Sequence, residues 1–144
     1  MIRIICPGKI KEKYLKDAID DYTNRISKYH KIEIIEVEDS NPLDEGKKIL
    51  KYIDSRDYVI TLEIEGNNIS SEEFANKLDK IFITNSRISF VIGGSYGLSD
   101  DVKERSDYKL SFSSFTFPHG LFRVILLEQI YRAFKILNNE TYHK

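Results

Sequence analysis

Three short segments of the chain carry the residue types that hold ligands in proteins. Residues 62–66 continue one apolar run, residues 93–97 are dense in glycine after another, and residues 111–117 alternate phenylalanine with serine and threonine. Glycines let backbone N–H groups approach a ligand because no side chain stands between them. Phenylalanine rings wall pockets for flat heterocycles, while hydroxyl and backbone groups fix the orientation. Each segment also has a plainer interpretation, as a tight turn or as a strand with core phenylalanines and surface serines.

Other common ligand-binding patterns are missing from the sequence. Residues 7–9, after the first apolar run, match neither the glycine pattern of dinucleotide-binding loops nor the phosphate loop of nucleotide hydrolases. The histidines His30, His119 and His143 and the single cysteine Cys6 lack the spacing of a metal site, so we expect no metal. We interpret Cys6 as a packed apolar thiol and His30 as a surface residue at a helix end.

Apolar periodicity alternates between strand and helix along the chain. It predicts strands at residues 2–6, 32–37, 58–64, 88–92 and 110–112. It predicts helices at residues 14–29, 47–53 and 70–82, a short helix after Ser99, and a long helix at 118–137. This alternation implies an α/β fold with a mostly parallel sheet of five to six strands and helices on both faces. Ligands bind at the C-terminal ends of parallel strands, so the three segments are expected to line one crevice.

The long helix at 118–137 is apolar on more than one side. Twelve positions between Leu121 and Leu137 are apolar, which is more than one stripe against a sheet requires. In a domain this small, we expect the second apolar side to meet another copy of the chain, giving a homodimer with two-fold symmetry. The alternative is a helix enclosed within its own monomer.

Length and composition place the chain among ordinary globular proteins. It has 144 residues, of which 41% are hydrophobic and 31% are charged, and this predicts a single domain over residues 1–144. No apolar stretch reaches the length of a signal peptide or a membrane span, and one cysteine makes no internal disulfide. We therefore expect a cytoplasmic protein without membrane attachment.

Charge is nearly balanced but unevenly distributed. Residues 1–31 carry eight basic and four acidic side chains. Residues 32–73 carry four basic and twelve acidic side chains, and residues 74–144 carry ten basic and seven acidic side chains. The net charge of −1 argues weakly against a nucleic-acid binder, because phosphate contacts usually demand a basic excess. If the basic segments at the two ends of the chain converge in space, they still form a local basic patch.

Several motifs along the chain resemble one protein family. They are V-I-G-G-S-Y-G-L at 91–98, L-S-F-S-S-F-T-F-P-H at 110–119, R-V-I-L-L-E-Q-I-Y-R-A-F-K-I at 123–136, Y-H-K at the end, C-P-G-K-I-K-E-K-Y near the start and T-L-E-I-E-G at 61–66. In this order and spacing, the chain resembles the ribosomal large-subunit pseudouridine N3-methyltransferases (RlmH), of the SPOUT or α/β-knot class. The stretch between Asp39 and Lys47 is shorter than expected for that family.

This resemblance implies a C-terminal trefoil knot, a rare exception to unknotted topology, that binds S-adenosylmethionine. Carried onto this sequence, the cofactor contacts fall at Leu62, Gly93, Phe112, Ser113, Ser114, Phe115, Thr116 and Phe117. These positions belong to the three segments already grouped by the strand-end argument. The implied substrate is a pseudouridine in the large-subunit rRNA hairpin at the subunit interface, methylated at N3 in the assembled ribosome.

Methyl transfer from a sulfonium requires alignment of nucleophile and methyl carbon rather than a metal. An imide N3–H attacks poorly until its proton leaves, so a base or a positive field must favour the anion. We expect His119, Arg123, Tyr142 and His143 to serve this chemistry. His143 is a candidate proton acceptor, and Arg123 is suited to stabilise negative charge or hold a phosphate. The plainer interpretation is that these are ordinary helix-start and chain-end residues.

RNA contact is expected from Lys9, Lys11, Lys13 and Lys16, which a homodimer would pool with the C-terminal tail of the second copy. A small net-acidic chain favours recognition of the assembled ribosome's shape over that of an isolated hairpin. The alternative function is a noncatalytic ribosome-binding or assembly factor that keeps the fold without turnover.

Overall fold

The computed structural model describes residues 1–143 and contains a five-stranded sheet whose neighbouring strands all pair in parallel. The strands are β1 (Ile2–Pro7), β2 (Ile32–Val37), β3 (Tyr58–Asn67), β4 (Ile88–Ile92) and β5 (Tyr108–Leu110). Their order across the sheet is β2-β1-β4-β3-β5. The predicted α/β class with a parallel sheet is confirmed.

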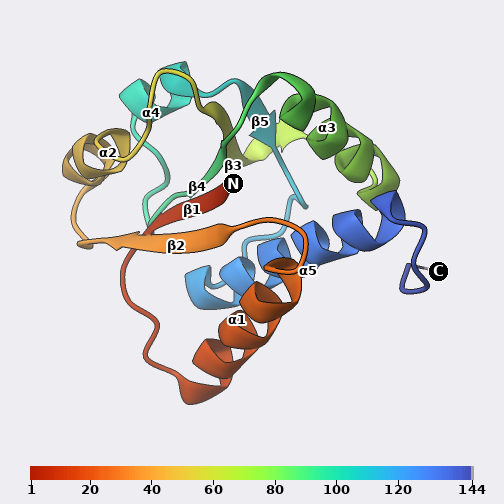
Figure 1. Cartoon of the computed structure of the whole chain (residues 1–144). Helices are drawn as coiled ribbons and strands as arrows, with labels where there is room; N and C mark the ends of the chain where they lie inside the picture. The colour runs from red at the N-terminus through yellow and green to blue at the C-terminus, as the bar shows by residue number, and fades with distance from the viewer. Residues whose placement is uncertain (144) are drawn as a thin grey trace.

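Helices cover both faces of this sheet (Figure 1). The helices α1 (Lys13–Ile26), α3 (Ser71–Thr84) and α5 (His119–Leu137) pack on one face, and α2 (Pro42–Leu50) and α4 (Asp100–Arg105) pack on the other. The long α5 contacts both α1 and α3. Each face therefore encloses its own apolar core.

The central strand β4 shows how the sequence divides between these two cores. Successive side chains of a strand point to opposite faces. Ile88, Phe90 and Ile92 enter the core beneath α1, α3 and α5, whereas Val91 enters the core beneath α2 and α4. All five β4 residues are buried, as a strand covered on both faces requires. The 93–97 segment thus begins at the rigid centre of the sheet.

Serine side chains cap the starts of two helices on the sheet. At the start of α3, the Ser70 hydroxyl accepts the Glu73 N–H at 3.1 Å, and the Glu73 carboxylate accepts the Ser70 N–H at 3.1 Å. At the start of α4, the Ser99 hydroxyl accepts the Val102 N–H at 3.4 Å. Both caps satisfy N–H groups that the helix itself leaves without a partner.

Several elements differ from their predicted boundaries, among them α2 and β5. Helix α2 begins at Pro42 rather than at residue 47, because the Asn41 side chain caps it by accepting the Asp44 N–H at 2.9 Å. Strand β5 covers Tyr108–Leu110 rather than residues 110–112, because its pairing with β3 becomes irregular at Leu110. The predicted fifth strand is thus present but ends at Leu110, and Phe112 belongs to the segment that follows.

Helix α1 leaves the aromatic ring of its first turn in solvent. Tyr14 is 72% exposed, whereas its neighbour Leu15 is buried. The helix ends at Ile26, which is fully buried. A helix face turns about 100° per residue, so a shift of one position moves a ring from the core to solvent.

The apolar character of α5 is largely explained within a single chain. Leu126, Leu127, Ile130, Ala133 and Phe134 are all buried in the monomer. Enclosure by α1 and α3 therefore accounts for much of the pattern, and the homodimer stays a prediction. Within residues 1–143, none of the helices has the length and apolar character needed to cross a membrane.

The His30 imidazole is part of an aromatic stack, which corrects its interpretation as a surface residue. Its ring stacks on Phe82 with centroids 4.1 Å apart and on Phe134 with centroids 5.3 Å apart. The Tyr29 ring stacks on the other side of the cluster, 5.4 Å from Phe134. Burial lowers the pKa of His30, and the positive N-terminus lowers it further.

We predict that this stack makes stability fall on mild acidification. Since the folded pKa of His30 lies below its unfolded value, the unfolded chain binds more protons between the two, and stability is lost as the pH falls from about 6.5. Thermal unfolding of the wild type and of His30→Phe, compared at pH 7.5 and 5.5, measures the effect. The wild type should lose a few degrees more than the variant. Equal losses in both proteins would contradict a contribution from His30.

Candidate functional site

One cavity of about 590 Å³ lies where β3, β4 and β5 end, and all three predicted segments line it. Its wall includes Leu62, Glu63, Glu65, Gly93, Gly97, Lys103, Phe112, Ser113, Phe115, Thr116, Phe117 and His119. The expectation that residues 62–66, 93–97 and 111–117 meet in one crevice is therefore confirmed. Of the eight predicted cofactor-contact residues, Ser114 alone does not line the cavity, and the cofactor role of all eight stays a prediction.

The glycine segment makes a tight turn that only glycine permits. A Cβ on Gly93 would lie 2.9 Å from the carbonyl carbon of Gly97, and Gly97 itself has a φ of +83°. The Gly97 N–H donates to the Gly94 carbonyl at 3.1 Å and closes the turn. The interpretation as a tight turn is confirmed, and the ligand-binding role of this segment stays a prediction.

Helix α2 supports this turn from the side away from the cavity. A Cβ on Gly94 would lie 2.8 Å from Oε1 of Glu45, whose side chain is buried. Burial raises the pKa of the Glu45 carboxyl and nearby Asp39 adds to the rise, while the Ser40 N–H, donating at 2.8 Å, opposes it. Sequence reasoning missed Glu45, since no local signal distinguishes a buried glutamate in a polar helix.

Hydrogen bonds to β3 fix the start of the 111–117 segment. The Ser111 N–H donates to the Asn67 carbonyl at 2.9 Å, and the Asn68 side chain donates to the Ser111 carbonyl at 2.9 Å. Two residues later the Ser113 hydroxyl accepts the Phe115 N–H at 2.9 Å and forms a turn. The segment therefore leaves β5 in a defined direction, across the open end of the cavity.

Phenylalanine rings form the apolar wall. Phe122 of α5 packs edge-on against Phe112 at 5.3 Å and stacks on Phe117 at 5.8 Å between ring centroids. Phe115 lies at the rim and is 79% exposed. Two of the three phenylalanines in the segment thus pack against α5, and the third faces solvent.

The charged groups of the cavity are two carboxylates, one ammonium and one imidazole. Glu63 and Glu65 come from β3, Lys103 from α4, and the exposed His119 from the first residue of α5. The Thr61 hydroxyl donates to Glu63 at 2.7 Å and fixes that carboxylate. The two glutamates lay within a predicted segment, but sequence reasoning gave them no role because they fit the exposed positions of any strand.

Arg123 does not face the cavity. Its side chain is 2% exposed and pairs with the Glu36 carboxylate at 2.6 Å. Its second terminal nitrogen donates to the carbonyls of Pro7 and Gly8 at 2.9 and 2.8 Å. This geometry corrects the prediction that Arg123 stabilises substrate charge or holds a phosphate, since its terminal nitrogens are engaged inside the protein.

Tyr142 and His143 lie near the middle of α5 and the start of α3, apart from the residues that line the cavity. The Tyr142 hydroxyl donates to Glu128 at 2.7 Å, and both burial and this bond raise the Tyr142 pKa. His143 lies between Glu72 at 2.5 Å and Arg132 at 3.0 Å. Lys144, which ends the Y-H-K motif, is outside the described residues. Within one chain, His119 is thus the sole predicted catalytic residue among those described that lines the cavity.

Cys6 is not available as a nucleophile. The side chain is buried at the end of β1, and burial raises its thiol pKa to about 12. Across residues 1–143, no three His, Cys, Asp or Glu side chains gather in a way that would hold a metal ion.

The chain is similar along its whole length to proteins with matching names. A family model described as "Predicted SPOUT methyltransferase" matches residues 1–143. The "Ribosomal RNA large subunit methyltransferase H" of Clostridium botulinum (strain Kyoto / Type A2) is 54% identical over 157 positions, covering 99% of each chain. The "Ribosomal RNA large subunit methyltransferase H 1" of Clostridium perfringens (strain SM101 / Type A) is 51% identical with the same coverage.

These alignments contain more positions than the chain has residues, so both relatives include residues that this chain lacks. That the missing residues fall between Asp39 and Lys47 stays a prediction. Among solved structures, a "probable methylase family protein" from Haemophilus influenzae Rd KW20 superposes with a TM-score of 0.60. It is 16% identical, with 99% of this chain and 70% of that one covered, and at this identity the likeness concerns the fold alone.

We predict that Arg123 acts through stability. Arg123→Met leaves Glu36 and two carbonyls without their buried partner, which should lower the free energy of unfolding by about 3–5 kcal/mol. Arg25→Met removes an exposed pair with Asp21 and serves as the control, with an expected loss under about 1 kcal/mol. Urea denaturation measures both. If Arg123→Met unfolds at the same urea concentration as the control, the structural role is refuted.

Proposed function

Because the chain belongs to the SPOUT methyltransferase family, we propose that it uses S-adenosylmethionine to methylate N3 of a pseudouridine in large-subunit ribosomal RNA on the assembled ribosome. The observation that carries this proposal is the single cavity lined by the 62–66, 93–97 and 111–117 segments. The names of the Clostridium relatives support ribosomal RNA as the substrate. Membership of the family brings with it an α/β fold with a C-terminal trefoil knot.

S-adenosylmethionine fits this cavity in size and charge. The cavity volume of about 590 Å³ falls in the range of about 300–1,000 Å³ that small-molecule sites occupy. The carboxylates of Glu63 and Glu65 complement the cofactor's sulfonium and amino groups, and the phenylalanine wall suits its adenine ring. When bound, the cofactor supplies the methyl group on a positively charged sulfur.

His119 is the residue we assign to the N3 proton. It lines the cavity at the first residue of α5 and is exposed, so an incoming base can reach it. By accepting the proton as N3 attacks, the imidazole avoids the build-up of negative charge on the pyrimidine ring. The walls contributed by Gly93 and Phe112 hold the two reactants aligned, which is the larger part of the catalytic task.

A second copy of the chain is required to bring Tyr142 and His143 into this chemistry. Within one chain these residues are bonded to Glu128, Arg132 and Glu72, away from the cavity. In a homodimer they serve the cavity of the other subunit. The proposal of catalytic roles for Tyr142 and His143 therefore depends on dimerisation.

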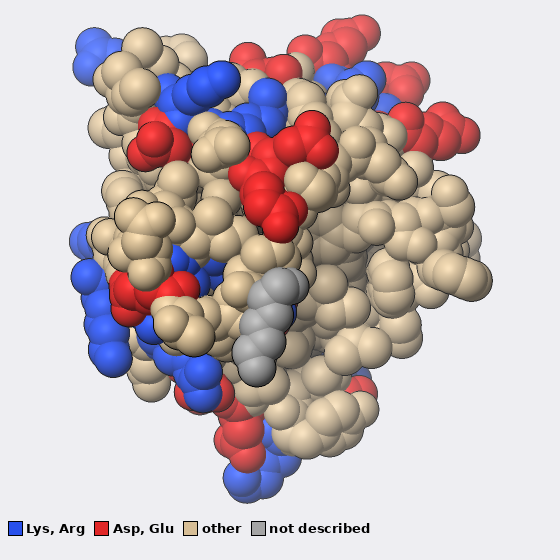
Figure 2. Space-filling model, turned by 90° about the vertical axis from the view of Figure 1, so that its right-hand side faces the viewer, with Lys and Arg blue, Asp and Glu red and all other residues tan. Residues whose placement is uncertain are grey.

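A homodimer is supported by the low charge of one side of the molecule. On the side shown in Figure 2, the Lys, Arg, Asp and Glu side chains lie along the left, the top and the bottom, with some carboxylates near the centre, and a broad area at the right is without charge. In the sequence, Arg123 is the one Lys, Arg, Asp or Glu residue between Leu110 and Leu127, and it is buried. Leu121, in the first turn of α5, remains 42% exposed. Interfaces between identical subunits are typically apolar and depleted in charge.

The second candidate is a noncatalytic ribosome-binding or assembly factor. The observation that favours it is the position of Arg123, Tyr142 and His143, none of which lines the cavity within one chain. Both candidates bind the ribosome, but cofactor binding and methyl transfer belong to the enzyme alone. The two experiments below therefore separate them.

We predict micromolar binding of S-adenosylmethionine to the wild type in isothermal titration calorimetry. Gly93→Val should abolish it, because the turn has no room for a side chain beside Gly97. The exposed Ile83→Val on α3 is the matched control and should bind like the wild type. Circular dichroism confirms that each variant is folded. Absence of binding by the wild type would favour the noncatalytic factor.

We predict that ribosomal RNA from a strain lacking the protein loses one methyl group on a single pseudouridine. Mass spectrometry of nuclease fragments detects the change, and the wild-type gene should restore the modification. A gene carrying His119→Ala should restore at most about a hundredth of the initial rate, since a positioned base contributes about 10²-fold or more. An unchanged pseudouridine in the deletion strain would contradict the proposed substrate.

A further inference from the structure

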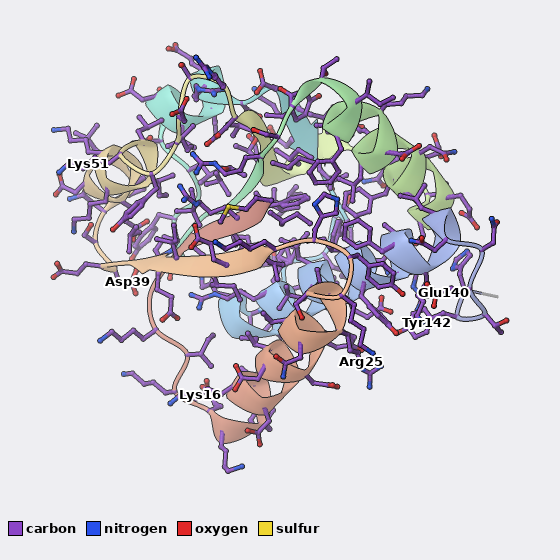
Figure 3. The ribbon with its side chains drawn as sticks, in the orientation of Figure 1. Lys16, Arg25, Asp39, Lys51, Glu140 and Tyr142 are labelled. Carbon is purple, nitrogen blue, oxygen red and sulfur yellow. The ribbon has the colours of Figure 1, made fainter. Side chains whose placement is uncertain are left out.

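The loop between β1 and α1 and the first turn of α1 form a surface that the cavity does not use. Its exposed basic and aromatic side chains are Lys9, Lys11, Lys13, Tyr14 and Lys16, here called the basic loop surface, and Glu12 is exposed among them. Tyr14 is 72% exposed although it is aromatic. In Figure 3, Lys16 lies at the lower left, where this loop enters α1. A ring this exposed buries little apolar surface within the chain.

The charges of this surface are suited to phosphate groups. Between Gly8 and Lys16 the one acidic residue is Glu12. Lys13 pairs with Asp17 at 2.7 Å. Within residues 1–143, Lys9, Lys11 and Lys16 have no carboxylate within ion-pair distance. Free ammonium groups around an exposed ring are the combination by which proteins hold single-stranded nucleic acid, with lysines on phosphates and a ring against a base.

The loop is held in place by buried contacts. Arg123 donates to the carbonyls of Pro7 and Gly8, and the Glu36 carboxylate that pairs with Arg123 also accepts the Ile10 N–H at 3.2 Å. Gly8 has a φ of +85°, which turns the chain sharply after β1. A preformed loop loses little conformational entropy when it binds a partner.

The basic loop surface adjoins the cavity through α5. A Cβ on Gly120 would lie 2.8 Å from Cδ1 of Leu15 and 3.0 Å from Cδ1 of Ile10, so the loop and α1 pack directly on the first turn of α5. His119, the preceding residue, lines the cavity. The loop that carries the lysines is therefore anchored beside the start of α5, which lines the cavity.

We propose that the basic loop surface binds single-stranded ribosomal RNA beside the target nucleotide, with the Tyr14 ring stacked on an unpaired base and Lys9, Lys11 and Lys16 on the flanking phosphates. The inference rests on the proposed function, because it names the surface that delivers the target base to the cavity. Stacking suits any base, so this surface contributes affinity, while the cavity selects the nucleotide.

Sedimentation binding to ribosomes at several salt concentrations tests the proposal. Tyr14→Ala should weaken binding about tenfold at every salt concentration, because the ring carries no charge. Tyr14→Phe keeps the ring and should bind like the wild type. The double variant Lys9→Ala, Lys11→Ala should instead flatten the salt dependence, lowering the slope of log K against log salt by about 1–2. A loss of affinity at every salt concentration thus reports the contribution of the ring, and a changed salt slope reports that of the lysines.

The control is Ile83→Ala, which removes another exposed apolar side chain, on α3 at the opposite side of the ribbon (Figure 1). It should bind ribosomes and S-adenosylmethionine like the wild type. Tyr14→Ala should keep its cofactor affinity, its maximal methylation rate at saturating ribosomes and its molar mass in solution. A raised KM for ribosomes alone is the expected kinetic result.

Two outcomes overturn the inference. Unchanged ribosome binding by Tyr14→Ala would exclude stacking, and a changed molar mass would show that the ring packs against a second copy instead. Because binding is measured apart from methyl transfer, a wild type that binds ribosomes without methylating them contradicts the proposed function. Unchanged binding by Tyr14→Ala, with methylation intact, contradicts this inference alone.

Discussion

The buried guanidinium of Arg123 is the contact on which the arrangement of the site depends. It ties the first turns of α5 to the end of β1 through two carbonyls and to β2 through Glu36. A charge this deeply buried is tolerated only while its partners stay in place. The 111–117 segment leads directly into α5, so this one cluster fixes the cavity wall, His119 and the basic loop surface relative to one another.

Features carried by neighbouring residues were predictable from the sequence. The capping box of α3, the apolar run of β4 and the glycine density after it all depend on positions a few residues apart. The meeting of three distant segments was also predictable, because parallel strands end at one edge of a sheet. The cavity's location thus followed from local pattern and a general rule of topology.

What could not be predicted depends on contacts between distant parts of the chain. Arg123 meets partners 87 to 116 residues earlier, and nothing beside it in the sequence distinguishes it from an exposed arginine. Glu45 of α2 lies against Gly94 in the turn after β4, and nothing beside Glu45 in the sequence indicates this contact. Tyr14 and Leu15 are adjacent, and either side chain could face the core by its apolar character. Packing of Leu15 against Gly120 of α5 decides that Leu15 is the buried one.

The strand order has a consequence for the chain during its own synthesis. Strand β1 pairs on one side with β2, which is synthesised soon after it. On its other side it pairs with β4, where Ile2 faces Ile88, a residue made 86 positions later. A lone pair of strands is marginal in water, so the apolar edge of β1 waits for most of the polypeptide to be translated. The N-terminal third is therefore the part most exposed to aggregation as a nascent chain, and translation arrest before β4 leaves it without a native partner.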